Sequence, residues 1–210
     1  MPTPGPTQIR PRKQPVQARS ASTVAALHEA SIQVLLSAGY RKFTTTRVAA
    51  RAGVSVGSLY QYFPNKAAIL FRLQSDEWRQ TAELLRVILE DIKRPPLERL
   101  RALVHAFLRS ECDEAAVRVA LDDAAPLYRD APEAQEARAS ADRTVQVFMR
   151  EALPKASEAT CALAGDLITT TLSTVGKQFS ETPRTSAEIE AYAEAMADMF
   201  CAYLRGLQHG

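Results

Sequence analysis

Hydroxyl, amide and small side chains are concentrated between residues 43 and 66, in an order suited to hydrogen bonding with a polyanion. Thr44 or Thr45 can cap one short helix at its start. Gly53 can adopt the positive φ of a tight corner, and Ser55 can cap a second short helix after it. Two short helices that cross at such a corner form a helix-turn-helix.

At about 100° per residue, the core face of the second helix holds its three apolar side chains, Val56, Leu59 and Phe63. The opposite face holds Gly57 and Gln61. Ser58 and Tyr60 flank this opposite face, which is therefore small and polar. Such a face can approach base edges closely and form hydrogen bonds with them. Tyr62 lies nearer the core face, at the helix end, where its hydroxyl could reach a phosphate.

Two further groups could hold phosphates on either side of this helix. Asn65 is predicted to cap the next helix, so the first amides of that helix, with Lys66 beside them, form an anion site. Thr45, Thr46 and Arg47 offer similar chemistry at the start of the preceding helix. Helices packed at such a corner also occur in domains that bind no DNA, so the corner alone does not decide the function.

Charge is divided unevenly along the chain. Through Lys66 there are nine basic residues and one acidic residue, Glu29, which gives a net charge of +8. The remainder carries 17 basic and 23 acidic residues, a net charge of −6. This division places a polyanion-binding surface in the first third of the chain. A basic segment could also aid solubility or lie on a membrane surface, but the polar helix face and the anion sites favour DNA.

At these residues the chain resembles the TetR family of one-component transcriptional repressors. The resemblance extends over residues 20–70, and its motif is Thr44-Thr45-Thr46-Arg47-Val48-Ala49, then Ala52-Gly53-Val54-Ser55, then Gly57-Ser58-Leu59-Tyr60 with Tyr62-Phe63, Asn65-Lys66 and Ile69-Leu70. It implies a homodimer that binds a palindromic operator in double-stranded DNA. It also implies a C-terminal domain in which a small-molecule effector binds and releases the DNA.

The resemblance further implies which residues contact DNA. They are Thr45, Thr46, Val56, Gly57, Ser58, Tyr60, Gln61, Tyr62 and Lys66. Base edges would be contacted by Ser58 and Gln61, with Gly57 permitting close approach. Phosphates would be contacted by Thr45, Tyr60, Tyr62 and Lys66. Basic residues of the N-terminal arm (Arg10, Arg12 and Lys13) could enter a minor groove or remain disordered.

Helical periodicity accounts for the whole of the chain after its first residues, and no alternating β pattern competes with it. Residues 1–18 are rich in proline and basic side chains and are predicted to form a flexible basic arm. The rest predicts an all-α fold of about nine helices. Residues 19–65 would form a three-helix DNA-binding domain with the helix-turn-helix, and residues 66–210 a helical ligand-binding and dimerisation domain.

Several residues mark where the helices should begin and end. Gly39 is predicted to close the first helix in a left-handed conformation. The helix after the helix-turn-helix should extend to about Lys93, and Asp130 should cap a later one. Thr185 and Glu188 form a capping box at the start of the last helix.

The helix predicted from Pro154 to Phe179 carries apolar residues on two sides, which is more than one domain core needs. Together with the last helix, Thr185–Leu207, it would form a self-complementary four-helix interface in a homodimer. The alternative is a helix that is fully buried within a monomer.

The expected effector is an apolar or amphipathic small molecule, because the sequence suggests no charged side chain placed to pair with a strongly ionic ligand. Candidate ligand-binding residues are Trp78, His105, Leu108, Tyr128, Phe148 and Thr171, with Phe107 and Met149 nearby. The alternative for each of these residues, and the one that the sequence favours, is an ordinary place in the core.

Other classes of function find little support. His28, His105 and His209 have no partners at catalytic or metal-ligand spacing, so neither an enzyme nor a metal or cofactor site is expected. The three separated cysteines are expected to be buried thiols. Without a signal peptide or a long apolar run, the protein is expected to be cytoplasmic, with no membrane partner. An architectural DNA-binding protein without an effector is the alternative function.

Overall fold

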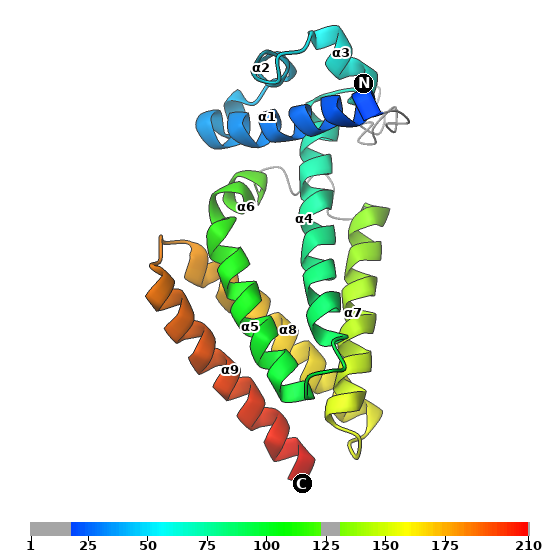
Figure 1. Ribbon diagram of the computed structural model, residues 1–210, viewed down its shortest axis with the longest axis vertical. Coiled ribbons are helices and arrows are strands. Elements are labelled where there is room, and N and C mark those ends of the chain that lie inside the picture. The colour runs from blue at the N-terminus through cyan, green and yellow to red at the C-terminus, as the bar shows by residue number, and fades with distance from the viewer. Residues whose placement is uncertain (1–17, 123–130, 210) are drawn as a thin grey trace, which may run out of the picture. The chain divides into compact units, whose positions relative to one another are not determined.

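A computed structural model describes residues 18–122 and 131–209, and in these ranges it contains nine helices and no strand (Figure 1). The helices are α1 (Ala18–Lys42), α2 (Thr45–Arg51), α3 (Val56–Tyr62), α4 (Lys66–Leu89), α5 (Pro96–Asp113), α6 (Ala115–Asp122), α7 (Pro132–Ala152), α8 (Glu158–Ser180) and α9 (Ser186–His209). The predicted all-α fold is thereby confirmed. The basic arm before residue 18, the expected cap Asp130 and the candidate ligand residue Tyr128 lie outside the described residues.

The chain divides by its contacts into two compact units. One contains Met1–Trp78 with Ala116–Ala134, and the other contains Arg79–Ala115 with Gln135–Gly210. The boundary proposed from the sequence at residue 65 falls inside the first unit, because Ile69 and Leu70 of α4 are buried in the same cluster as the helix-turn-helix. Leu121 of α6 belongs to that cluster too, although α6 is far away in the sequence.

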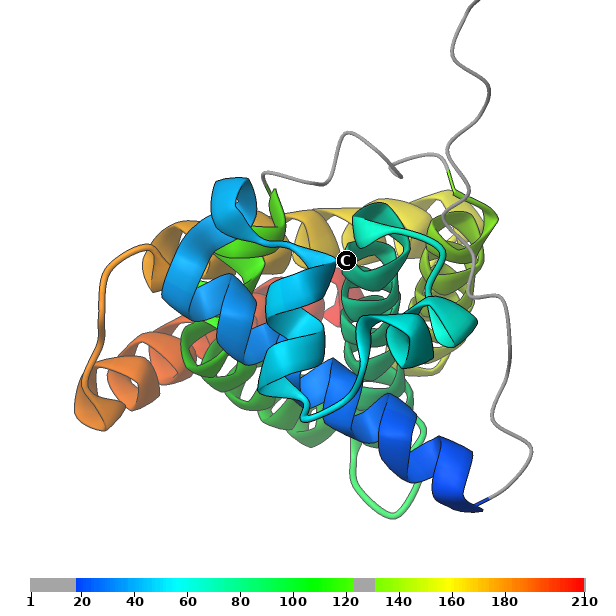
Figure 2. The same ribbon diagram turned by 90° about the horizontal axis from the view of Figure 1, so that it is seen from above.

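In the first unit, α2 packs across α1, as Figure 2 shows from above. The core between them is apolar and includes Leu27, Leu35, Val48 and Leu59, none more than 1% exposed. Gly39 has φ 69° and ψ 169°, a positive-φ conformation that glycine adopts readily, but not the left-handed helical conformation that was predicted. The helix resumes after this kink and continues to Lys42, four residues beyond the predicted end at about residue 38.

The helix after the helix-turn-helix ends earlier than expected. α4 stops at Leu89, and a turn follows in which Oδ1 of Asp91 accepts a hydrogen bond from the backbone amide of Lys93 at 3.3 Å. Asp91 therefore breaks the helix before Pro95 and Pro96 could, because its side chain competes for backbone amides.

The second unit is built around α5, which packs against both α8 and α9. Its core includes Leu103, Val104 and Leu108 of α5, each at most 1% exposed. Gly176 of α8 lies directly on α5: a Cβ added there would lie 3.0 Å from Cε1 of Phe107. The absence of a side chain at this position is therefore what lets the two helices approach so closely.

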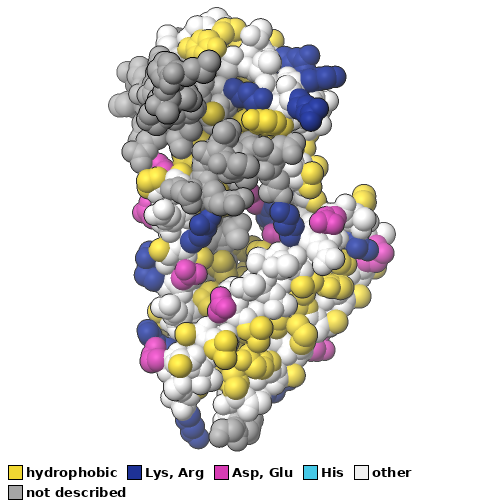
Figure 3. Space-filling model, turned by 180° about the vertical axis from the view of Figure 1, so that it is seen from behind, with side chains coloured by type: hydrophobic (Ala, Val, Ile, Leu, Met, Phe, Trp, Pro, Cys, Tyr) yellow, Lys and Arg dark blue, Asp and Glu magenta, His cyan; other side chains and the backbone are white. Residues whose placement is uncertain are grey.

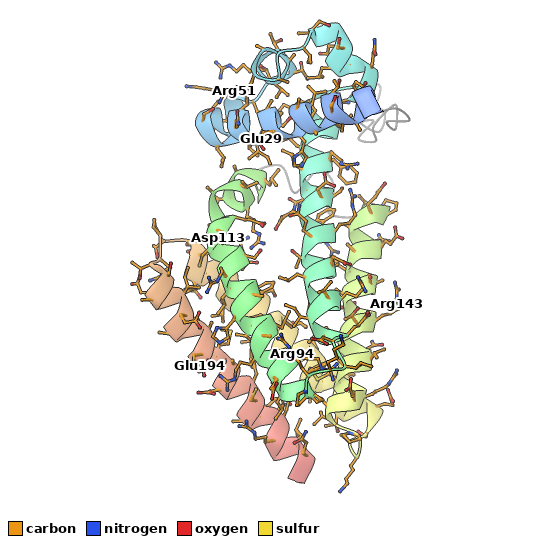
Figure 4. The ribbon with its side chains drawn as sticks, in the orientation of Figure 1. Glu29, Arg51, Arg94, Asp113, Arg143 and Glu194 are labelled. Atoms are coloured by element: carbon orange, nitrogen blue, oxygen red, sulfur yellow. The ribbon has the colours of Figure 1, made fainter. Side chains whose placement is uncertain are left out.

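Charged side chains form a ladder along the exposed side of the α5–α9 contact. Arg101 pairs with Glu194 and Asp198, and Arg109 pairs with Glu190 at 3.2 Å. Glu194 is labelled in Figure 4, on the side of α9 that faces α5. These pairs are solvent-exposed, and each contributes at most about 1 kcal/mol. They therefore fix the alignment of α9 along α5 more than they add to the stability of the unit.

The capping box predicted at the last helix is present. Oγ1 of Thr185 accepts from the Glu188 amide at 3.3 Å, and Oε2 of Glu188 accepts from the Thr185 amide at 2.7 Å. These hydrogen bonds stabilise the carboxylate and lower the pKa of Glu188. The box is local in sequence, which is why spacing alone could predict it.

The cysteines match the expectation in two of three cases. Cys161 and Cys201 are buried free thiols, and burial raises the pKa of the Cys201 thiol. Cys112 is only half-buried, so the expectation was wrong there, because it lies near the end of α5 at the margin of the core. Among the described helices, none is long and apolar enough to cross a membrane.

Candidate nucleic-acid interface

The corner between α2 and α3 has the local structure that the sequence predicts. Thr44 caps α2, with its Oγ1 accepting from the Arg47 amide at 3.3 Å, and Ser55 caps α3, with its Oγ accepting from the Ser58 amide at 3.0 Å. Gly53 between the two helices has φ 69°, which strains a residue with a side chain. Val48 and Leu59 are completely buried and join the two helices beneath the corner.

α3 turns a small, polar surface to solvent. Gly57, Tyr60 and Gln61 are exposed, whereas Leu59 is completely buried, so the helix has the two faces that its sequence pattern predicts. Val56 and Ser58 are half-buried. The hydroxyl of Ser58 lies 2.8 Å from Oγ of Ser55, so part of its hydrogen-bonding capacity is already used within the cap.

The start of α2 joins the exposed face of α3. Oγ1 of Thr45 lies 3.2 Å from the hydroxyl of Tyr60, and Thr46 beside it is exposed. Two hydroxyls from different helices are thus held together at the edge of α3. Each hydroxyl can donate one hydrogen bond and accept others, so the pair can bind a phosphate oxygen without leaving a polar atom unsatisfied.

Tyr62 and Lys66 are less available than the resemblance implies. Tyr62 is only 9% exposed and belongs to the core of the first unit. Lys66 folds back on α1: its Nζ donates to the Tyr40 carbonyl at 2.6 Å and lies 3.9 Å from the centre of the Tyr40 ring. Partial burial lowers the pKa of Lys66. Lys66 therefore holds the C-terminal end of α1 in addition to any contact with a ligand.

The first helical turn of α4 has the cap that was predicted. Oδ1 of Asn65 accepts a hydrogen bond from the Ala68 amide at 2.9 Å. Asn65 thereby satisfies one of the amides that the turn leaves without an intrahelical partner. The turn follows α3 directly, so its amides and Lys66 lie within a few residues of Tyr60 and Gln61 in the sequence.

The candidate effector residues are divided between the two units, apart from Tyr128, which lies outside the described residues. Leu108 and Phe148 are buried in the core of the second unit, where Thr171 is half-buried on α8. Trp78 belongs to the first unit, where its ring meets that of Phe71 edge to face, with the centroids 6.4 Å apart.

His105 faces the carboxylates of α9 instead of the core. Its Nδ1 lies 3.2 Å from Glu190 and its Nε2 3.0 Å from Glu194. The sequence could have signalled this arrangement. Arg101, His105 and Arg109 repeat every four residues on α5, opposite the acidic repeat Glu190, Glu194 and Asp198 on α9.

Taken together, a capped helix-turn-helix in a basic first unit and a helical second unit define the class of helix-turn-helix transcriptional regulators. Two family models specify the class further. Residues 27–73 match the model of bacterial regulatory proteins of the tetR family, and residues 95–207 match that of tetracyclin repressor-like C-terminal domains. The chain belongs to the TetR family of transcriptional regulators.

Individual relatives agree with this assignment. The fatty acid metabolism regulator protein of Bacillus subtilis is 35% identical over 65 residues, which is 31% of this chain and 32% of that relative. The match thus spans about a third of the curated relative.

Solved structures of low sequence identity share the fold. A protein of Mesorhizobium loti assigned to the TetR family has a TM-score of 0.71 at 18% identity, with 89% of this chain and 98% of that chain covered. The fatty acid degradation regulator FadR of Bacillus halodurans has a TM-score of 0.65 at 18% identity, with 90% and 96% covered.

Proposed function

We propose that this regulator is a repressor that binds a palindromic operator as a homodimer and leaves it when a small apolar or amphipathic effector binds. The observation that carries the proposal is the exposed face of α3, where Gly57 and Gln61 stand beside the Thr45–Tyr60 hydroxyl pair. A helix with a small, polar outer face can enter a major groove, because no bulky side chain keeps it away from the base edges.

The proposed contacts divide by chemistry. Gln61 and Ser58 would hydrogen-bond to base edges, Gly57 would permit close approach, and Val56 would make an apolar contact at the start of α3. Phosphates would be held by Thr45, Thr46, Tyr60, Tyr62 and Lys66. The Thr45–Tyr60 distance of 3.2 Å supports a shared phosphate. Tyr62 and Lys66 need a change of side-chain position to reach one, because both are engaged within the first unit.

The proposed dimer uses α8 and α9. Figure 3 shows apolar side chains gathered on one face of the second unit. Leu163 and Leu167 of α8 are 64% and 46% exposed, and Tyr192 and Met199 of α9 are 38% and 52% exposed. Exposure of large apolar side chains to water is unfavourable, and burial of them against a partner would lower the free energy. A second copy presenting the same two helices completes a four-helix interface.

The proposed effector is apolar because two of the candidate residues, Leu108 and Phe148, lie among aliphatic and aromatic side chains in the second unit. Phe107, Leu108, Phe148 and Met149 share one buried cluster. Several relatives are named for fatty acid metabolism, and fatty acids and acyl thioesters are therefore the first compounds to test. The curated relative matches over only 65 residues, so its name by itself does not identify the effector of this chain.

The experiment that tests the repressor function is selection of bound duplexes from a random DNA library, followed by titration of the selected duplex with and without fatty acids and their acyl thioesters. We expect a two-fold symmetric consensus and weaker binding with an effector. Equal affinity for selected and random duplexes would contradict operator recognition. Specific binding that no compound alters would instead support a constitutive DNA-binding protein.

Replacing Gln61 with alanine should reduce the preference for the selected operator, whereas replacing Lys66 with alanine should weaken all duplexes alike. In each subunit, a lost base contact removes about 1–3 kcal/mol of discrimination, while a lost phosphate contact lowers the salt slope by about 0.9, which is about 1.8 for the homodimer. Affinities for the selected duplex and a scrambled duplex over a range of salt separate the two effects. Unchanged specificity in the Gln61→Ala variant would show that this side chain does not contact a base edge.

Replacing Gly57 with alanine should stabilise the free protein slightly and weaken operator binding. An added Cβ meets only Oγ of Ser55, at 3.7 Å, so the fold has room for it. Alanine restricts the unfolded chain and adds about 0.4–1 kcal/mol of stability, but its methyl group separates α3 from the groove. Thermal unfolding and operator titration measure the two effects. A Gly57→Ala variant that binds as tightly as the wild type would show that the DNA does not approach this position closely.

A further inference from the structure

Both ring nitrogens of His105 on α5 face carboxylates of α9. Nδ1 lies 3.2 Å from Oε1 of Glu190, and Nε2 lies 3.0 Å from Oε2 of Glu194. An ionised carboxylate only accepts hydrogen bonds, whereas a neutral imidazole donates through one nitrogen and carries a lone pair on the other. The neutral ring would therefore direct a lone pair at a carboxylate oxygen in one of the two contacts. Only the imidazolium can donate to both carboxylates at once.

We propose that His105, Glu190 and Glu194 form a pH-sensitive switch, which we name the histidine switch. With the ring protonated, both contacts hold α9 against α5. Loss of the proton removes one contact, loosens α9 and weakens the proposed homodimer, and with it operator binding. The link to DNA rests on the proposed function, because α9 contributes one of the two helices of the proposed interface.

The charges around the ring balance only when it carries its second proton. Along this side of the contact, α5 and α9 contribute two arginines and three carboxylates, namely Arg101, Arg109, Glu190, Glu194 and Asp198. Their sum is +2 − 3 = −1 while the ring is neutral and 0 once it is protonated. Each arginine already pairs with at least one of the carboxylates. The proton on His105 therefore supplies the positive charge that the group lacks.

The helices that pack against α5 carry other ionisable side chains, and these keep one charge state near neutral pH. On α9, Sγ of Cys201 lies 3.5 Å from the Leu97 carbonyl, and burial raises the pKa of this thiol, so it stays uncharged. On α8, Asp166 and Lys177 are exposed and stay ionised. Histidine is the side chain whose charge ordinarily changes between about pH 5 and 8. Within this group, the proton that is lost in that range is therefore the one on His105.

The histidine switch acts on the helix that carries part of the proposed interface. Tyr192 lies between Glu190 and Glu194 in the sequence and is 38% exposed. Its ring also stacks on that of Phe179 of α8, with the centroids 4.2 Å apart. A shift of α9 along α5 therefore moves Tyr192 and changes its contact with α8. Both changes alter the surface that a second copy of the chain must match.

His28 in the first unit provides a comparison. Among the described residues, its ring has one carboxylate contact, between Nε2 and Oδ2 of Asp76 at 3.4 Å. The same oxygen accepts from Nε of Arg72 at 2.7 Å. A neutral ring with its hydrogen on Nε2 can make this single contact. The requirement for two protons is thus a feature of His105 and does not extend to every histidine beside a carboxylate.

The first test is the pH dependence of thermal unfolding of the full chain. Because the protonated ring is the one that fits the folded unit, the stability it adds is present at low pH and is lost as the pH rises. His105→Gln should lower the melting temperature by about 2–4 °C at about pH 5.5 and by less than about 1 °C at about pH 8.5. His105→Arg keeps its charge at both values, so it should match the wild type at the lower pH and exceed it at the higher.

A background that lacks the two carboxylates is the control for this test. In the Glu190→Gln, Glu194→Gln variant, the further change His105→Gln should have the same small effect at both pH values. A pH-dependent effect that persists in this background would overturn the inference. So would an effect of His105→Gln on the wild type that is equal at both pH values, as expected of a merely structural side chain. If His105→Gln does not fold, a melting temperature of His105→Arg equal to that of the wild type at the higher pH would overturn it.

The second test is sedimentation of the same proteins at the two pH values. The dissociation constant of the wild-type homodimer should rise at the higher pH by about two- to fivefold for each switch. It should be high at both values in His105→Gln and low at both in His105→Arg. His28→Gln is the matched control, because it removes a histidine beside a carboxylate from the first unit, and it should follow the wild type. Equal pH dependence in the wild type and in both His105 variants would overturn the link to assembly.

Failure of the proposed interface gives a different result. In that case the melting temperatures still depend on His105 and pH as described, while Leu163→Glu with Leu167→Glu leaves the assembly intact. That outcome supports the histidine switch and overturns the interface. Melting temperatures without the expected pH dependence, in a protein that these two substitutions make monomeric, overturn the switch and support the interface.

Discussion

Replacing Leu163 and Leu167 with glutamate is expected to convert the proposed homodimer into monomers that bind the proposed operator only weakly. Both side chains project from α8, 64% and 46% exposed, on the face that the proposed partner covers. A carboxylate buried against the partner's apolar helices would lose its hydration without gaining a counter-charge. The protein would then engage one half-site at a time, and the gain of about 10²–10⁴ in affinity from linking two half-sites would disappear.

Analytical ultracentrifugation measures the change of mass, and operator titration measures the loss of affinity. Val147→Glu is the control, since Val147 is an aliphatic residue that is 61% exposed, much like Leu163, but belongs to α7, which is not part of the proposed interface. We expect this control to remain dimeric. A double variant that still sediments as a dimer would place the interface elsewhere on the molecule.

Replacing Arg99 with alanine should cause a large loss of stability in the second unit. Arg99 is only 1% exposed, pairs with Glu151 of α7, donates to the Leu89 carbonyl at the end of α4, and lies 5.5 Å from the centre of the Phe148 ring. Truncation removes these contacts and leaves a cavity among three helices. We expect a loss of about 3–5 kcal/mol.

Arg99→Met separates packing from charge. Nε of Arg99 is buried without a hydrogen-bond partner in the described part of the chain, so the native residue already carries a desolvation cost. Methionine fills similar space without that cost and leaves Glu151, which is 44% exposed, in contact with water. Its loss of stability should therefore be less than half that of Arg99→Ala. Urea denaturation measures both variants, and equal losses would show that the charge matters more than the volume.

Local features were predictable from the sequence because they depend on residues a few positions apart. The positive φ of Gly53, the caps at Thr44 and Ser55, and the capping box at Thr185 all follow from stereochemistry or from hydrogen bonds that span three residues. The two faces of α3 follow from helical periodicity in the same way. These features suffice to recognise the corner and the class of protein.

Contacts between distant residues were not predictable in this way. Lys66 reaches back 26 residues to Tyr40, and Arg99 reaches forward 52 residues to Glu151. His105 was expected to meet an effector but faces two carboxylates of α9, because its side of α5 packs against that helix. The spacing within one helix does not by itself indicate which other helix packs against it; here the signal was the pair of matching repeats of opposite charge on α5 and α9.

The sequence by itself therefore determined the all-α fold, the helix-turn-helix and the concentration of positive charge in the first third of the chain. Periodicity, capping and composition are properties of the chain alone, and they suffice for such conclusions. Only the tertiary structure decided which of those cations face solvent and which are engaged. Lys66 was predicted to be a phosphate anchor, yet it lies on Tyr40, while Arg47 and Arg51 stand exposed along α2. The physical reason is that the direction of a long, flexible side chain is set by the helices packed around it, and those come from other parts of the chain.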